Sequence, residues 1–244
     1  MQPGFPLRDP RFLISCHMCD DSPPRLKAAD LQKLAQQRLA EMQAGEEELH
    51  PVINTTRKLA RNFWGSAWMK QLAHCESGGM CLAPGRTLLR HGCVLDLRIT
   101  PGCITALVSA EELYEVELLI SPLEEEQLNA LSQACSNHIN SLLSLLKGDT
   151  TPDVLQQLCH PDHGLLPTPQ DWRMRCTCPD WAEPCPHAAA AIYAAGCLID
   201  ENPELLFTLR SMDAAVLLQK PTAPAPLDTK KLADIFGIDI IETY

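Results

Sequence analysis

Aromatic residues are scarce in this 244-residue chain, at 5% of its composition. A hydrophobic content of 45% still suffices for a core, which we expect to consist mainly of Leu, Ala, Val and Ile. No apolar run approaches the roughly 20 residues that a membrane span requires, so no membrane contact is predicted. The sequence also lacks a glycine-rich phosphate loop, an H-E-x-x-H motif and a Ser-His-Asp order, which favours a protein without catalytic activity.

Basic residues are outnumbered, with 20 Lys and Arg against 31 Asp and Glu, and the net charge of −11 argues against a uniformly basic nucleic-acid binder. The charges are segregated, however: residues 57–98 hold seven basic and two acidic side chains, whereas residues 111–126 hold seven glutamates and no Lys or Arg. Basic side chains interleaved with aromatic residues can bind phosphates and stack bases. The candidate nucleic-acid contacts are Arg57, Lys58, Arg61, Arg86 and Arg90. The alternative is a solvated basic face on a helix whose Trp64 and Trp68, four residues apart, form one buried stripe.

The N-terminal residues show no charged-then-apolar signal segment, although the chain contains twelve cysteines. Cysteines outside one dense cluster are scattered through apolar stretches rather than spaced as a disulfide framework. We therefore expect reduced, mostly buried thiols in a cytoplasmic protein.

The dense cluster is C-x-C-x6-C-x-H, made by Cys176, Cys178, Cys185 and His187. Three thiolates and one imidazole are a usual ligand set for a closed, tetrahedral structural zinc site. Residues two apart in an extended segment point the same way, and Pro186 followed by an alanine-rich run predicts a helix that starts at the second ligand pair. The alternative is a chance grouping in a cysteine-rich chain. We predict one bound Zn²⁺ that supplies folding energy and leaves no open position for catalysis.

The cluster and its surroundings resemble the bacterial SWIM zinc finger family, whose signature is C-x-C, a spacer, then C-x-H. The similarity covers roughly residues 50–244 and includes three further stretches: Phe63-Trp-Gly-Ser-Ala-Trp68, His91-Gly-Cys-Val-Leu-Asp-Leu97 and Asn202-Pro-Glu-Leu-Leu-Phe-Thr-Leu-Arg210. The resemblance implies a zinc module that contacts protein or nucleic acid, often beside SWI/SNF-type helicase ATPases, and it implies no catalytic activity. Pro186 stands where the family usually has Lys or Arg, and residues 109–112 replace a Ser-Gly-Ser type turn. Both departures disfavour nucleic-acid contact.

Two further hypotheses concern residues near the cluster and cysteines far from it. Asp180 and Trp181 are predicted to support the metal site, with Asp180 binding backbone N–H groups of the ligand loop and Trp181 covering the ion; the alternative is a functional surface role. A second metal site could combine Cys16 and Cys19 with Cys159 and His163, although no companion spacing supports it.

The predicted fold class is α+β, with an antiparallel sheet of three or more strands, packed helices and a strand–strand–helix zinc unit. Helices are expected near 24–44, 56–75 and 121–146, and strands at 93–99, 103–108 and 113–120. The expected units are an N-terminal extension at 1–55, a helix and sheet domain at 56–122, a helical connector at 123–170, the zinc finger with following helices at 171–219, and a proline-rich linker with a tail at 220–244.

The tail carries an apolar set that could dock into a partner groove or pack back on its own body: Leu232, Ile235, Phe236 and Ile238. Together these features predict a zinc-binding adaptor protein with a protein partner, suspected from the resemblance to be a SWI/SNF-type helicase. The alternatives are direct nucleic-acid binding and an enzyme with an unrecognised site.

Overall fold

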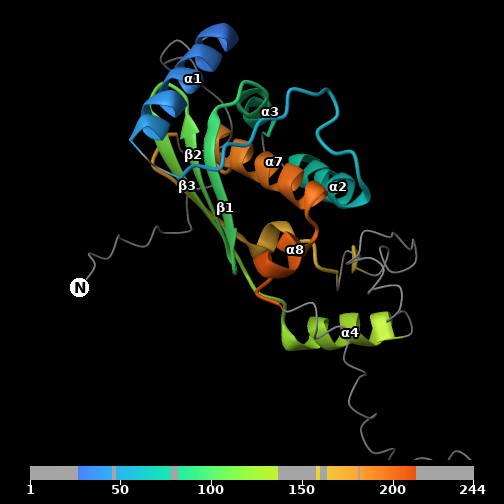
Figure 1. Ribbon diagram of the computed structural model, residues 1–244. Coiled ribbons are helices and arrows are strands. Elements are labelled where there is room, and N and C mark those ends of the chain that lie inside the picture. Colours follow the sequence, from blue (N-terminus) through green and yellow to red (C-terminus); the bar gives the residue numbers. More distant parts are fainter. Residues whose placement is uncertain are drawn as a thin grey trace, which may run out of the picture.

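The computed structural model describes residues 27–45, 48–77, 82–136, 158–159, 164–180 and 182–212. These residues form an antiparallel sheet with helices packed against it, which confirms the predicted α+β class (Figure 1). Buried side chains from the sheet and from most helices belong to one hydrophobic cluster. No helix within the described ranges is long and apolar enough to cross a membrane.

The sheet has four strands in the order β1 (Val94–Thr100), β2 (Cys103–Ser109), β3 (Leu113–Ile120) and β4 (Trp172–Cys176), each antiparallel to its neighbour. The first three strands confirm the predicted meander. Gly102 has φ +70°, the left-handed conformation that the tight β1–β2 turn requires and that glycine adopts without strain. The fourth strand comes from just before the cysteine cluster, far along the chain.

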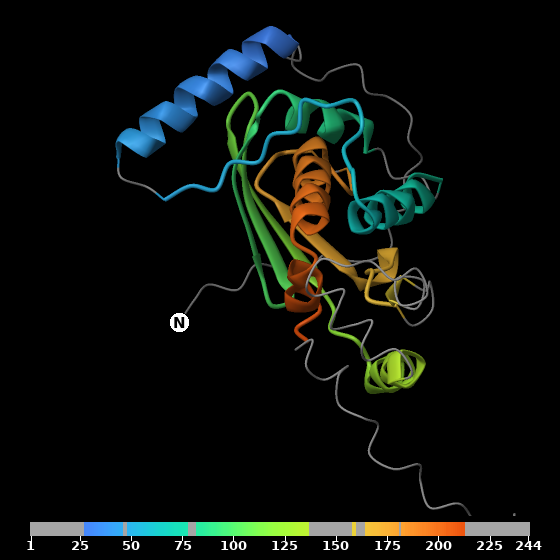
Figure 2. The same ribbon diagram turned by 45° about the vertical axis from the view of Figure 1, so that its right-hand side comes forward.

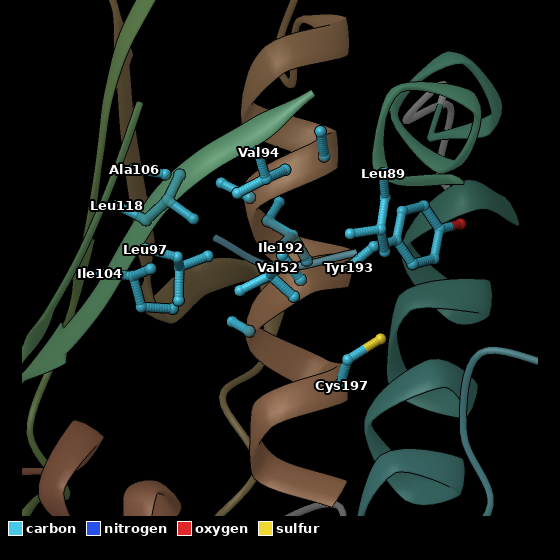
Figure 3. Packing of buried hydrophobic residues seen from close by; sticks show 14 of the residues in the cluster. Val52, Leu89, Val94, Leu97, Ile104, Ala106, Leu118, Ile192, Tyr193 and Cys197 are labelled. Carbon is cyan, nitrogen blue, oxygen red and sulfur yellow. The ribbon is translucent and has the colours of Figure 1, made fainter. Parts of the chain in front are cut away.

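Helix α7 (Pro186–Glu201) lies between the sheet and two other helices, α2 (Phe63–Ser77) and α3 (Ala83–Arg90) (Figures 1 and 2). Thirteen of its sixteen residues are buried, because neighbours cover it on both sides. Six of these sixteen residues are alanines, whose small side chains let surrounding elements approach the helix closely. In Figure 3, Leu97, Ile104 and Leu118 face α7 from the sheet, while Tyr193 points from α7 toward the other helices.

Gly85 marks the closest approach of α3 to α7. A Cβ atom at this position would lie 2.5 Å from the Cβ and carbonyl carbon of Ala189, far inside van der Waals contact. The glycine therefore lets α3 and α7 cross at a distance that the side chain of any other residue would increase.

Helix α2 begins at Phe63 and not at residue 56, so the predicted start of this helix is wrong. The preceding segment instead forms a side-chain turn, in which Asn54 accepts from the N–H of Thr56 and donates to the carbonyl of Leu59. The predicted burial of the two tryptophans is confirmed: Trp64 and Trp68 are 3% and 2% exposed. Trp68 donates its indole N–H to the Ile192 carbonyl of α7 at 3.1 Å.

Three other helices lie around this body: α1 (Ala28–Ala44), α4 (Glu125–Ser136) and α8 (Glu204–Leu209). Helix α1 is held to the β2–β3 turn by Arg38, whose guanidinium donates to the carbonyls of Ala110, Glu111 and Glu112. A short 3-10 turn, η1 (Pro169–Asp171), precedes β4. Its Asp171 pairs at 3.4 Å with buried Arg210, which follows α8.

Candidate metal centre

Strand β4 and the loop directly after it supply the first two cluster residues. Cys176 lies at its C-terminal end, opposite Val116 of β3, so its side chain shares the sheet face that carries Val116 and contacts α7. Cys178 follows two residues later and is partly buried against the same core, as the C-x-C spacing predicts. The pairing of β4 with β3 therefore fixes the direction in which this half of the cluster points.

The start of α7 supplies the other two residues. Cys185 is the N-cap residue, with an extended backbone, and its Sγ accepts from the N–H of Ala188 at 3.4 Å. Pro186 occupies the first helical position, where its missing N–H costs nothing and its fixed φ suits the helix. His187 follows in the first turn and is 7% exposed, so both residues sit on a well-defined helix start.

One ligand atom from each of Cys176, Cys178, Cys185 and His187 lies within 4.8 Å of all the others; these four residues are hereafter the Cys3His cluster. The Nδ1 atom of His187 is 3.9 Å from the Sγ atoms of both Cys176 and Cys185. Ligands around a tetrahedral Zn²⁺ at the usual bond lengths are about 3.5–3.8 Å apart. A small contraction would therefore bring the four atoms to bonding distance of one ion, and the residues fit a metal site.

The thiols of the cluster are already coupled through hydrogen bonds. The bond with Cys176, supported by His187 and the Ala188 N–H, lowers the pKa of Cys185 to about 4. The same bond with Cys185, together with burial, raises the pKa of Cys176, and burial raises the pKa of Cys178. All three sulfurs have a backbone N–H donor, and we assign the thiolate to Cys185 because its donor, the Ala188 N–H, belongs to the start of a helix. A metal ion would replace the shared protons and bind all three sulfurs as thiolates.

Neighbouring residues hold the cluster in place, and the sequence pattern pointed to only one of them. Tyr114 of β3 lies against the His187 ring, with centroids 4.2 Å apart. Thr177 exchanges two hydrogen bonds with Glu115, at 3.1 Å from its N–H and 3.0 Å to its hydroxyl. Asp180 accepts from the N–H of Ala182 at 3.0 Å, which agrees with a role in shaping the ligand loop. Trp181 lies outside the described residues.

The strand–strand–helix arrangement expected around the cluster is not what the described residues show. One strand, β4, precedes α7, and it pairs with β3 of the main sheet rather than with a second strand of its own. Residues between the cluster pairs include Pro179 and Pro184, which cannot donate to a strand ladder and so disfavour a hairpin there.

The candidate nucleic-acid contacts separate into two groups. Arg57, Lys58 and Arg86 line one pocket, together with Tyr193 of α7. Arg90 donates to the Arg57 carbonyl at 3.2 Å, and neither Arg90 nor Arg61 lines that pocket. Tyr193 lies six residues after His187, which places the two side chains about 120° apart around the axis of α7. The basic residues of this pocket and the Cys3His cluster therefore lie on different sides of this helix.

Several predicted residues fall outside the described ranges: Leu232, Ile235, Phe236, Ile238, Cys16, Cys19 and His163. Cys159 is described, and it packs partly buried against the core, where burial raises its pKa to about 12. Within the ranges that the structure covers, the Cys3His cluster is the one group of three or more Cys, His, Asp or Glu side chains close enough to share an ion.

Comparisons with known proteins add little to this geometry. No protein-family model matches the chain, and no solved structure matches it. An uncharacterized protein of Mycobacterium tuberculosis strain H37Rv, Rv2102, is 26% identical over 168 residues, which are 68% of this chain and 60% of that protein. The chain thus spans about 60% of the length of this relative, whose name assigns it no activity.

Proposed function

We propose that the Cys3His cluster binds one structural Zn²⁺ and that the protein acts by binding another macromolecule rather than by catalysis. The observation that carries this proposal is the closed donor set. Three sulfurs and one imidazole nitrogen within 4.8 Å of one another would fill all four positions of a tetrahedral ion. No position would remain for a water or a substrate, so the metal would contribute stability and not a Lewis-acid site.

The four residues would bind the ion from two different elements of the fold. Cys176 and Cys178 would bind it from the end of β4 and the loop after it, and Cys185 and His187 from the start of α7. The ion would hold the edge of the sheet to the start of the central helix. The surrounding loop would then be a rigid surface element, which is the property that a docking module requires.

The proposed role is that of an adaptor, and the resemblance to SWIM fingers suggests a SWI/SNF-type helicase as the partner. The acidic net charge of −11 supports a protein partner over a nucleic acid, because non-specific duplex binding depends on clustered cations. The residue before His187 is also Pro186 and not the Lys or Arg usual in SWIM fingers, so one cation is missing beside the cluster.

Metal content tests the first half of the proposal. Elemental analysis of native-purified protein is expected to give one zinc per chain, and Cys178→Ala is expected to reduce this below about 0.1. Cys103→Ala is the matched control, because Cys103 is a half-buried thiol on β2 outside the cluster. A native protein without zinc, or a Cys178→Ala variant with a full complement, would refute the site.

Affinity capture from native cells tests the second half. The zinc-loaded chain is expected to capture a helicase ATPase equally well with and without nuclease treatment, and Cys178→Ala is expected to lose it. Removing residues 221–244 is also expected to abolish capture while the zinc content stays at one. Capture that disappears on nuclease treatment would favour nucleic acid as the bridge and would reject the adaptor role.

Direct nucleic-acid binding remains the second candidate, because Arg57, Lys58 and Arg86 do gather at one place. Under the adaptor proposal, a labelled duplex should bind only weakly in about 150 mM salt. Tight binding with a steep dependence on salt concentration would reverse the order of the two candidates.

A further inference from the structure

A concave site lies on the side of α7 that faces away from the sheet. It is separate from the metal cluster, so metal binding does not account for it. Its volume is about 370 Å³, within the range of small-molecule sites. Hereafter the basic pocket, it is lined by residues from the 57–60 segment, α2, α3 and α7: Arg57, Lys58, Leu59, Ala60, Ser66, Met69, Lys70, Ala73, Arg86 and Tyr193.

The charge of the basic pocket is of one sign. Four of its ten lining residues are cations, Arg57, Lys58, Lys70 and Arg86, and none is acidic. This contrasts with a whole chain in which acidic residues outnumber basic ones. Cations brought together from three separate segments repel one another, and an anion placed among them would relieve that repulsion.

Arg86 is oriented by contacts within the fold rather than extended freely into solvent. Its Nη2 donates to the Tyr193 hydroxyl at 2.7 Å, and its guanidinium carbon is 5.0 Å from the centre of the Tyr193 ring. Its Nε atom is buried and makes no hydrogen bond within the described structure. A buried charged donor without an acceptor is costly, and an oxyanion in the basic pocket could satisfy such a group.

Most of the remaining lining residues are apolar, which restricts the kind of anion. Leu59, Ala60, Met69 and Ala73 contribute to the wall between the cations. Leu59 and Ala60 are already buried, but Met69 is partly exposed and Ala73 is exposed. A bare inorganic ion would leave Met69 and Ala73 uncovered, whereas an organic group attached to the anion would cover them and gain from their burial. Guanidinium and ammonium groups suit a phosphate, to which arginine can donate two hydrogen bonds.

A nucleic-acid strand fits the arrangement less well. Single strands bind along grooves in which cations follow the backbone over several nucleotides. Here four cations gather at one pocket, and the neighbouring Arg61 and Arg90 do not extend its lining into a groove. We propose that the basic pocket binds a small phosphate monoester, with the phosphate among Arg57, Lys58, Lys70 and Arg86 and the organic group against Met69 and Ala73. This proposal is independent of the metal site and of the adaptor role.

Titration calorimetry with the full-length protein tests the proposal, using inorganic phosphate, phenyl phosphate, adenosine 5′-monophosphate and a 12-residue oligothymidylate without a terminal phosphate as probes. At least one monoester should bind about tenfold more tightly than inorganic phosphate. Raising the salt from about 50 to 500 mM should weaken the binding, because screening increases. Phenol and adenosine, which lack the phosphate, should not bind measurably.

Two substitutions address the pocket itself. Arg57 and Lys70 are exposed at the rim, so Arg57→Ala and Lys70→Ala should leave the fold intact and should each weaken the best monoester about fivefold. Arg61→Ala is the matched control, since Arg61 is exposed on the same segment but does not line the pocket, and it should change the affinity less than twofold.

Three outcomes would overturn the proposal. The first is that neither monoester binds at millimolar concentration. The second is that Arg61→Ala weakens binding as much as Arg57→Ala, which would mean a diffuse surface charge. The third is that the oligothymidylate binds more tightly than both monoesters and loses affinity with the same substitutions, which would make the pocket a nucleic-acid site.

Discussion

The two ends of helix α7 contact distant parts of the chain through different chemistry. At the N-terminal end, Cys185 and His187 meet Cys176 at the end of β4 and Cys178 in the loop that follows. At the C-terminal end, buried Asp200 accepts from the N–H groups of Arg61, Asn62 and Gly65 at 2.6–3.0 Å, and so caps the start of α2. Under the zinc proposal the first end would need an external ion to hold three sulfurs together as thiolates, whereas the second is complete with the atoms of the chain alone.

Because of this difference, the stability of one end of α7 would depend on bound metal, whereas the stability of the other end would not. A carboxylate surrounded by backbone donors is satisfied whenever the chain is folded. Neighbouring thiols all become thiolates only when a metal replaces their protons. Under the zinc proposal the protein would therefore have one contact that depends on the composition of the solution and one that does not, at the two ends of the same sixteen-residue helix.

The largest expected effect is that of metal removal. An ion present at 1,000 times its dissociation constant stabilises the folded state by about 4 kcal/mol. Chelation should lower the free energy of unfolding by about that amount, measured by urea denaturation. Hydrogen exchange should increase first in β4 and in the ligand loop, while β1, β2 and β3 remain protected.

Cys178→Ala provides the control for chelation. A chelator should not change the stability of this variant further, because its site no longer retains the ion. A chelator effect of equal size in both proteins would mean that the stabilising metal binds elsewhere.

The next effect is at the opposite end of α7. Asp200→Ala leaves three N–H groups at the start of α2 without their acceptor and should lower the free energy of unfolding by about 3 kcal/mol. Glu201→Ala, at the exposed neighbouring position, should change it by less than about 0.5 kcal/mol.

A substitution at the C-terminal end of α7 should not change zinc binding at its N-terminal end. Under conditions where Asp200→Ala remains folded, its zinc content should equal that of the unmodified protein. Loss of zinc in the folded variant would show that the ends are coupled through the helix.

A third substitution concerns the contact between α3 and α7 at Ala189, near the N-terminal end of α7. Gly85→Ala places a methyl group 2.5 Å from Ala189 and should destabilise the fold by about 2 kcal/mol, because backbone must move to admit it. Thr87→Ala, on an exposed position of the same helix, is the control. Equal melting temperatures for the two variants would show that the helix crossing adjusts at no cost.

The smallest effect is expected on the outer face of the sheet. Glu117 and Arg175 are cross-strand partners on β3 and β4, 3.7 Å apart and largely exposed. Glu117→Ala should change stability by about 0.5 kcal/mol or less. A double-mutant cycle with Arg175→Ala measures the coupling, and a value above about 1 kcal/mol would mean that this pair helps to hold β4 when metal is absent.

Local patterns in the sequence were sufficient to predict the meander and the Cys3His cluster. Alternation of apolar residues predicted β1, β2 and β3. The two short spacings, C-x-C and C-x-H, predicted the four residues of the cluster. These features depend on neighbours a few residues apart, which is the range over which backbone geometry constrains side-chain direction. The burial of Trp64 and Trp68 followed from the same local periodicity.

The remaining features depend on contacts between distant residues and left no local trace. The pairing of β4 with β3 joins segments about 50 residues apart, so no pattern in either strand reveals the other. The start of α2 is set by a carboxylate on α7, more than 130 residues away. For the same reason Tyr114 could not be assigned to the His187 ring, and the basic pocket could not be assembled from its four segments.

The indole rings of Trp68 and Trp172 meet edge to face, with centroids 5.5 Å apart. Because Trp172 begins the strand that ends at Cys176, this contact lies between helix α2 and the strand that leads to the cluster. Two indoles in such an arrangement couple optically and give a near-ultraviolet circular dichroism signal that depends on their mutual angle. The chain therefore carries its own spectroscopic reporter, and a change in the position of β4 on metal loading should be visible without an added dye.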